Sequence, residues 1–328
     1  MRPKTTQRWI STLSFALLTV VSSVATAQPA SFPDKPLKII NGFPAGGGSD
    51  ILLRAIVPAI SEKLGQPIVI DYRVGANGNL AMEAVARAAP DGYTLLMGAP
   101  SLATSPSLFT NLPFDPQKDF APISLVGIVQ NVLVVHPGVA ANNVRELVAI
   151  AKARPGKLNF TSPGGGSTQH LAAELFKLSA AIDIVHIPYK GGVQAQGDVI
   201  GGQAELTFNV VPAALPMIRA GRLRALAVTG RSRSEALPEV PTMIEAGYSG
   251  FTAFTWNGIV APAGTPRAVV MRLSDAVVGA MKSPEMKEQL AKIGQEAAWN
   301  TPDEFAAFLR EETEKWRRVI PAAGLKAQ

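Results

Sequence analysis

Two glycine-rich segments, each placed after a short apolar run, constrain the fold of this chain most strongly. The run 38–43 (KIINGF) predicts a buried strand, which breaks at 44–50 (PAGGGSD) before apolar residues recur at helical spacing over 51–64. Ser49 or Asp50 is the expected N-cap of that helix. The next elements expected are a strand at 67–72, a glycine loop at 75–79, a helix at 80–89 and a strand at 93–97. This order is typical of parallel βαβ units with right-handed crossovers.

The same order of elements recurs after Gly156. A strand at 157–161 breaks at 162–168 (SPGGGST), and a helix at 170–180 follows. The next elements expected are a strand at 183–189 that runs into Lys190-Gly191-Gly192, a helix-like segment and a strand at 204–210. The two GGGS segments begin 118 residues apart. We therefore predict two α/β lobes of similar topology.

The rest of the chain predicts a hinge between these lobes. An apolar run at 123–136 is long enough to pass from one lobe into the other, and 252–260 is the expected return. A strand is expected at 223–229 and C-terminal helices at 267–279, 284–293 and 302–319, the last one capped by Thr301 with Glu304 three residues on. We assign 28–130 with 251–328 to the first lobe and 131–250 to the second.

The N-terminus has the pattern of a cleaved secretory signal peptide. Arg2, Lys4 and Arg8 precede an apolar run at 10–24, and Ala25-Thr26-Ala27 supplies an A-x-A cleavage site. A transmembrane anchor is the alternative, but this run is shorter than about 20 residues. Cleavage after residue 27 removes half of the net charge of +6. We expect a soluble protein of the bacterial periplasm.

The composition and the absence of known catalytic motifs argue against most classes of enzyme. The 328 residues include no cysteine and three histidines, which excludes disulfides and cysteine zinc sites and leaves little material for another metal site. No Walker loop, nucleophile elbow or H-E-x-x-H occurs. The first loop matches G-x-G-x-x-G except that Ile51 replaces the third glycine, and Asp71 lies about 20 residues on, so an exported dinucleotide enzyme stays an alternative. No catalytic residue, cofactor, metal or nucleic acid is expected.

The histidines are expected to have structural roles. His136 and His186 lie in apolar strands and fit satisfied core or edge positions. His170 falls in the first turn of a predicted helix, where local hydrogen bonding explains it better than catalysis.

The glycine loops predict an anion site. A helix N-terminus leaves backbone N–H groups unpaired and carries partial positive charge, and glycine lets a ligand approach the backbone closely. Two facing loops could hold the two ends of a dicarboxylate, or the carboxylate of an amino acid. The alternative is that these glycines only serve tight turns.

Eight motifs in order give the chain a specific family resemblance. They are FPAGGGSDILLRAI, IVIDYRVGANGN, AVARAAPDGYTLLMG, SPGGGSTQHLAAELF, IPYKGG, LRALAVTGRSRSEALPEVPTMIEAG, APAGTP and AAGLK. Together they resemble the extracytoplasmic solute receptors of tripartite tricarboxylate transporters, the Bug family. The resemblance implies a type II periplasmic-binding-protein fold, with two doubly wound α/β domains joined by two crossing strands. It also implies a small organic acid as ligand (a di- or tricarboxylate, an aromatic acid or an amino acid) and a large and a small membrane permease subunit as partners. We expect a monomer.

The resemblance also implies ligand-binding positions in both lobes. Those in the first lobe are Phe43, Gly47, Gly48, Ser49, Asp50, Asn77, Gly78 and Ser101. Those in the second are Ser162, Gly165, Ser167, Thr168, Gln169, Tyr189, Lys190 and Asn209. Asp198 matches an acidic position for which we expect a structural role. Asn209, where relatives often have aspartate, and Asn41-Gly42, where an apolar-proline pair is usual, depart from the family pattern and leave the ligand's identity open.

A ligand-sensing adaptor for a membrane histidine kinase is the alternative function that the sequence leaves open. Such an adaptor would display a surface to the kinase.

Overall fold

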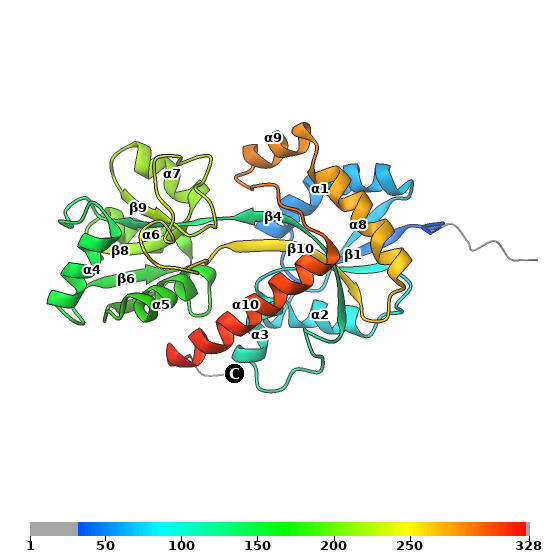
Figure 1. Cartoon of the computed structure of the whole chain (residues 1–328), viewed down its shortest axis with the longest axis horizontal. Helices are drawn as coiled ribbons and strands as arrows, with labels where there is room; N and C mark the ends of the chain where they lie inside the picture. The colour runs from blue at the N-terminus through cyan, green and yellow to red at the C-terminus, as the bar shows by residue number, and fades with distance from the viewer. Residues whose placement is uncertain (1–31, 190, 326–328) are drawn as a thin grey trace, which may run out of the picture. The chain divides into compact units, whose positions relative to one another are not determined.

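The computed structural model describes residues 32–189 and 191–325, so the expected signal peptide at 1–27 lies outside the described residues. Strands in the described part form two five-stranded sheets with helices packed on them (Figure 1). The first sheet, of order β2-β1-β3-β10-β4, contains β1 (Leu37–Asn41), β2 (Ile68–Tyr72), β3 (Thr94–Gly98), β4 (Phe120–Val129) and β10 (Thr255–Pro262). β1 pairs in parallel with β2 and β3, whereas β10 is antiparallel to β3 and β4.

The helices that pack with the first sheet come from before and after the second sheet in sequence. They are α1 (Gly48–Leu64), the 3-10 helix η1 (Ala76–Gly78), α2 (Asn79–Ala86), α3 (Ser101–Leu108), α8 (Arg267–Met281), α9 (Pro284–Lys292) and α10 (Pro302–Ala322). Leu52 of α1 and Val277 of α8 share one buried core with Ile39 of β1. Burial of these aliphatic side chains is the main free-energy term that holds the helices on the sheet.

The second sheet has the order β7-β6-β8-β5-β9. Its strands are β5 (Asn131–Val135), β6 (Asn159–Ser162), β7 (Val185–Pro188), β8 (Leu206–Val210) and β9 (Arg224–Val228). Its helices are α4 (Val144–Ala153), α5 (Thr168–Ala180), α6 (Gly192–Ile200) and α7 (Val211–Arg219). β6 pairs in parallel with β7 and β8, and β5 is antiparallel to β8 and β9.

The two sheets share one plan, which confirms the predicted two-lobed α/β fold. In each sheet three parallel strands stand in the order second, first, third, and two further strands follow, the first of them antiparallel to its neighbours on both sides. The chain enters the second sheet at Gln130 and returns over 229–254. Figure 1 shows β4 and β10 side by side where the chain crosses, and they pair antiparallel. The boundaries at 130/131 and 250/251 stay a prediction.

Three details of the sequence prediction were wrong. The run 123–136 is not one strand, because it divides into β4 and β5 at Gln130. α1 begins at Gly48 with Gly47 as its N-cap, so neither Ser49 nor Asp50 caps it. α3, α4 and α7 were not predicted, and α3 and α7 contain prolines that obscure a helical pattern. The capping box of Thr301 and Glu304 at α10 is confirmed.

Within residues 32–189 and 191–325, no helix is long and apolar enough to cross a membrane.

Candidate functional site

Six helices begin where a parallel strand ends. α1, α2 and α3 follow β1, β2 and β3, and α5, α6 and α7 follow β6, β7 and β8. The carboxyl ends of parallel strands lie at one edge of a sheet, which is where open α/β sheets bind ligands. Each sheet therefore presents three helix N-termini, with their partial positive charge, at one edge.

Most of these N-termini have no side-chain cap. The N-caps of α1, α2, α3, α6 and α7 are Gly47, Gly78, Pro100, Gly191 and Val210, and none accepts a capping hydrogen bond through its side chain. By contrast, Asn143, Ser283 and Thr301 cap α4, α9 and α10, whose N-termini lie away from the ends of the parallel strands. α5, capped by Ser167, and α8, which is uncapped, are the exceptions. Uncapped N–H groups at the strand ends are available to an anionic ligand, except at the start of α7, where Val211 N–H donates to the Gln130 carbonyl and Pro212 has no N–H.

The first glycine loop is a tight turn closed by Asp50. Gly46 has a φ of +81°, and its N–H donates to Asp50 Oδ2 over 2.7 Å. Gly47 N–H donates to the Pro44 carbonyl over 3.1 Å. A Cβ placed on Gly48 would meet nothing within 4 Å, so the backbone at the start of α1 is open to a ligand.

Asp50 is committed to holding this loop. Its side chain is buried and also accepts from Arg54 Nε at 3.0 Å and from the Tyr72 hydroxyl. Burial alone raises the pKa of Asp50, but the hydrogen bonds from Gly46, Tyr72 and Arg54 together bring it below its ordinary value. The hydrogen bond to Asp50 raises the pKa of Tyr72. Asp50 is thus an ionised carboxylate whose charge Arg54 balances.

Asn41, one of the departures from the family pattern, lies beneath the same loop. Its Oδ1 accepts from Phe43 N–H at 3.3 Å and from Ser49 Oγ at 3.1 Å. Its Nδ2 is buried without a hydrogen-bond partner. Ser49 therefore donates its hydroxyl proton inward and can only accept from a ligand.

Three of the predicted first-lobe residues meet at the start of α2. A Cβ placed on Gly78 would lie 3.5 Å from Ser101 Oγ and 3.6 Å from the ring of Phe43. Asn77, with a φ of +56°, precedes Gly78 in η1 and is exposed. The N-terminal residue of α3 thus lies against the turn that starts α2.

The second glycine loop is closed by side chains of its own. Ser167 Oγ donates to the Gly164 carbonyl at 2.8 Å and accepts from His170 N–H at 3.2 Å. Ser162 is buried, and its Oγ lies 2.7 Å from His186 Nε2 and accepts from Gly164 N–H at 3.2 Å. Gly165 is exposed, and a Cβ there would meet nothing within 4 Å.

The end of the second loop contacts elements that pack with the first sheet. Thr168 Oγ1 lies 3.0 Å from Thr255 Oγ1 at the start of β10 and donates to Gln169 Oε1 at 3.1 Å. A Cβ placed on Gly166 would lie 3.7 Å from Leu108 at the end of α3. α3 therefore touches the first loop cluster with its N-terminus and the second loop with its C-terminus.

The remaining predicted residues lie at the ends of β7 and β8. Tyr189 donates its hydroxyl proton to Asp198, which places Asp198 in a contact within the second lobe. Asn209 is buried, donates to Gln196 Oε1 and accepts from Val210 N–H at 2.9 Å, so its carboxamide is engaged at both ends. Lys190 lies outside the described residues.

The two histidines at the second loop have the structural roles expected from the sequence. The local hydrogen bonding of His170 is confirmed, since its Nδ1 accepts from Gly166 N–H at 3.1 Å. His186 lies on the edge strand β7, and its Nε2 has a hydrogen-bond partner in Ser162 Oγ at 2.7 Å, which also connects it to the loop. The spacing of His170 could have indicated its contact with the loop, because His170 follows Gly166 by four residues, as Asp50 follows Gly46.

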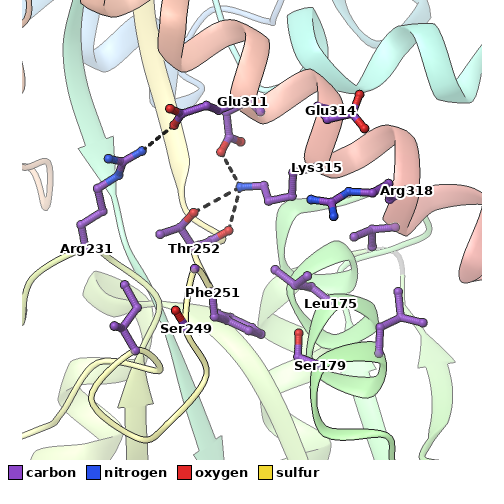
Figure 2. A pocket seen from close by; sticks show the side chains of 15 residues that line it. Leu175, Ser179, Arg231, Ser249, Phe251, Thr252, Glu311, Glu314, Lys315 and Arg318 are labelled. Atoms are coloured by element: carbon purple, nitrogen blue, oxygen red, sulfur yellow. Dashed lines mark hydrogen bonds and ion pairs between the residues drawn. The ribbon is translucent and has the colours of Figure 1, made fainter.

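A separate pocket of about 860 Å³ lies between α5, the segment 244–252 and α10, and none of the predicted site residues lines it. Figure 2 shows Lys315 of α10 pointing at Thr252, whose carbonyl accepts from Nζ at 2.8 Å. Arg231 at one side of the pocket pairs with Glu311 at 3.0 Å. This pocket has paired charges and lies on elements other than the glycine loops.

Comparisons with known proteins identify the family of this chain. Residues 52–325 match the model of the tripartite tricarboxylate transporter family receptor. The chain is 37% identical over 311 residues to the protein BugT of Bordetella pertussis, covering 93% of this chain and 95% of BugT.

Solved structures give the same result. An adipate-bound protein of R. palustris is 33% identical with a TM-score of 0.72, over 90% of this chain and 100% of that one. The malate-bound MatC of Rhodopseudomonas palustris is 29% identical with a TM-score of 0.68, over 88% and 100%. A ligand-free TctC solute-binding protein from Polaromonas is 27% identical with a TM-score of 0.83, over 89% and 99%. The chain therefore belongs to the tripartite tricarboxylate transporter receptor family, a family of periplasmic solute-binding receptors that includes the Bug proteins.

Proposed function

We propose that this protein captures a small organic carboxylate between its two lobes and delivers it to a membrane permease with one large and one small subunit. It acts in the periplasm as a monomer without catalysis, after export directed by residues 1–27. The observation that carries the proposal is the set of uncapped helix N-termini at the strand ends of both sheets. Adipate and malate, the ligands in two relatives, are both small dicarboxylates.

Neutral donors carry the proposed recognition. Asp50 is neutralised by Arg54, so the first loop offers backbone N–H groups and no net charge of its own. The exposed Gly48 and Gly165 allow one carboxylate to reach the backbone of each loop. The proposed binding residues are Phe43, Gly47, Gly48, Ser49, Asn77, Gly78, Ser101, Gly165, Ser167, Thr168, Gln169, Tyr189 and Lys190. Among these, the hydroxyls of Ser49 and Ser167 donate within the protein and so shape the loops, and do not donate to the carboxylate. Asp50, Ser162 and Asn209 support the same site through their internal contacts.

The two crossings of the chain between the sheets fit a hinge motion that closes the lobes on a ligand. Gln130 and the segment 229–254, where the chain crosses between the sheets, are the proposed hinge.

A thermal-shift and calorimetric screen tests the proposal. Adipate, malate, citrate, benzoate and glutamate are added to the mature protein, with adipamide as a control that keeps the length of adipate and lacks its charges. A ligand at about 100 times its Kd stabilises the fold by roughly 2.7 kcal/mol, which raises Tm by a few degrees. No shift with any acid, or an equal shift with adipamide, contradicts carboxylate capture.

Delivery needs a separate test. Uptake of the bound acid into vesicles that contain the permease pair is expected to depend on this protein. Binding without such uptake, together with ligand-dependent activation of a membrane histidine kinase, would favour the sensing role instead.

A further inference from the structure

Two histidines from different elements stack beneath the second glycine loop. His170, in the first turn of α5, and His186, on β7, have ring centroids 3.9 Å apart and planes inclined by 12°. The ring of Phe160 on β6 lies near both, with its centroid 4.8 Å from that of His186 and 6.1 Å from that of His170. The parallel register of β6 and β7 places Phe160 opposite His186. His170 is only 3% exposed, so its ring is part of a packed stack.

Each histidine supports one end of the loop. Gly166 N–H donates to His170 Nδ1 at the start of α5. His186 Nε2 lies 2.7 Å from Ser162 Oγ, which in turn accepts from Gly164 N–H. The segment 162–167 thus takes its conformation from two imidazole rings as well as from Ser167.

The hydrogen bond from Gly166 defines the tautomer of His170. Because Nδ1 accepts, the ring proton is on Nε2, which lies 3.6 Å from Glu174 Oε1. An imidazolium has a proton on both nitrogens and cannot accept from Gly166. Protonation of His170 must therefore break the contact that orders the end of the loop.

Charged groups around the stack act in both directions. On α5, Glu174 faces His170 and pairs with Lys177 at 3.1 Å. Burial alone raises the pKa of Glu174, but its contacts with His170 and Lys177 bring that pKa below its ordinary value, so Glu174 is an ionised carboxylate. Burial, and then the proximity of His170, lower the pKa of His186 from 6.5 to about 4, so His186 stays neutral near neutral pH.

We propose that His170 and His186 are positioning residues of the second glycine loop, and that protonation of His170 releases the loop and weakens carboxylate binding. This inference rests on the proposed function, because it gives that loop a role in binding. It makes the second lobe the half of the site that responds to pH. The periplasmic space is the compartment in which such a response would follow the external medium.

Hydrogen exchange in the ligand-free protein tests the loop directly. Exchange of 162–169 is measured between pH 5 and pH 8 relative to 44–50, which corrects for the intrinsic pH dependence. In the wild type the ratio is expected to rise at least tenfold towards pH 5. In His170→Asn, whose Oδ1 can replace Nδ1 as acceptor, the ratio is expected to stay flat. In His170→Leu it is expected to be high at every pH.

His136→Asn is the matched control. His136 Nδ1 also accepts from a glycine N–H, that of Gly138 at 3.0 Å, but at the end of β5. This variant is expected to keep the pH response of the wild type. A flat ratio in the wild type, or an unchanged response in His170→Asn, overturns the proposal.

Adipate binding provides the second measurement. Between pH 7.5 and 5.5 the Kd of the wild type is expected to rise at least fivefold more than that of His170→Asn, which experiences the same titration of adipate. Equal changes in the two proteins contradict the inference. If adipate and the other acids bind neither protein, the proposed function fails, while the exchange ratio still decides whether His170 positions the loop.

Discussion

The two glycine loops have the same backbone design and are held by opposite chemistry. In each loop, a glycine with positive φ (Gly46, +81°; Gly166, +75°) precedes an N-cap residue with extended backbone. The side chain four residues after that glycine accepts a hydrogen bond from the glycine's N–H. The acceptor is Asp50 in the first loop and His170 in the second. The structurally equivalent glycines, Gly46 and Gly166, are therefore 120 residues apart in sequence, whereas the two GGGS segments begin 118 residues apart.

Each acceptor side chain has a charged partner at the equivalent position of its helix, and the two partners, Arg54 and Glu174, carry opposite charges. Asp50 pairs with Arg54, and His170 faces Glu174, each four residues further along the helix. Loop geometry thus depends on an acceptor at one position and not on its charge. The choice of acceptor decides what protonation does to the contact, because an imidazolium has no nitrogen left to accept a hydrogen bond from the glycine N–H.

Removing the first acceptor is expected to have the largest effect on stability. Asp50→Ala leaves Gly46 N–H, Tyr72 and Arg54 without their common partner. Loss of a buried, hydrogen-bonded carboxylate costs about 3 kcal/mol of the free energy of unfolding, measured by urea denaturation.

Glu83→Ala is the control for this prediction. It removes the ion pair between the half-buried Glu83 of α2 and the exposed Arg87, which has the same helical spacing. It is expected to cost less than about 1 kcal/mol. Equal losses in the two variants would mean that Asp50 has no special role in the first loop.

The second loop is expected to confer a pH-dependent loss of stability. The pKa of His186 is about 4 in the folded protein and ordinarily 6.5. Above pH 6.5 the His186 imidazole is neutral in both the folded and the unfolded protein. As pH falls from 6.5 towards 4, it binds a proton in the unfolded protein but not in the folded one, so the free energy of unfolding declines. Tm measured across this window is expected to fall less in His186→Gln. An identical slope in the variant would remove His186 as the cause.

Removal of the N-cap of α5 is expected to change stability less than the changes at Asp50 and His186. It also tests whether binding affinity follows stability. Ser167→Ala removes the cap of α5 and costs about 1 kcal/mol. Ser283→Ala removes the equivalent cap of α9 and is expected to cost a similar amount. Calorimetry with adipate should show weaker binding only for Ser167→Ala. Weaker binding in both variants would show that affinity follows overall stability.

Much of this organisation could be predicted from local sequence. The strand, glycine loop and helix order placed the binding segments at strand ends, and the Thr301 capping box was correct because it depends on residues three apart. The division between β4 and β5 at Gln130 could not be predicted, because it depends on hydrogen bonds from residues far along the chain. Val211 N–H donates to the Gln130 carbonyl, and Gly230 N–H donates to its side chain. The Ser49 or Asp50 cap was wrong because Asp50 reaches back to Gly46 from inside the helix.

By itself the sequence determined two α/β lobes, their loops and the family, because apolar periodicity and glycine act through neighbouring residues. Only the tertiary structure decided what each loop residue does. Side-chain hydrogen bonds to residues 13 to 24 positions away orient three of them: Ser162 bonds with His186, Asp50 with Tyr72 and Asn209 with Gln196. The stack of His170 on His186 exists because parallel pairing of β6 and β7 brings β7 beside the start of α5. Contacts between residues distant in sequence depend on which strands pair with one another, and the residues of a single segment do not decide that pairing.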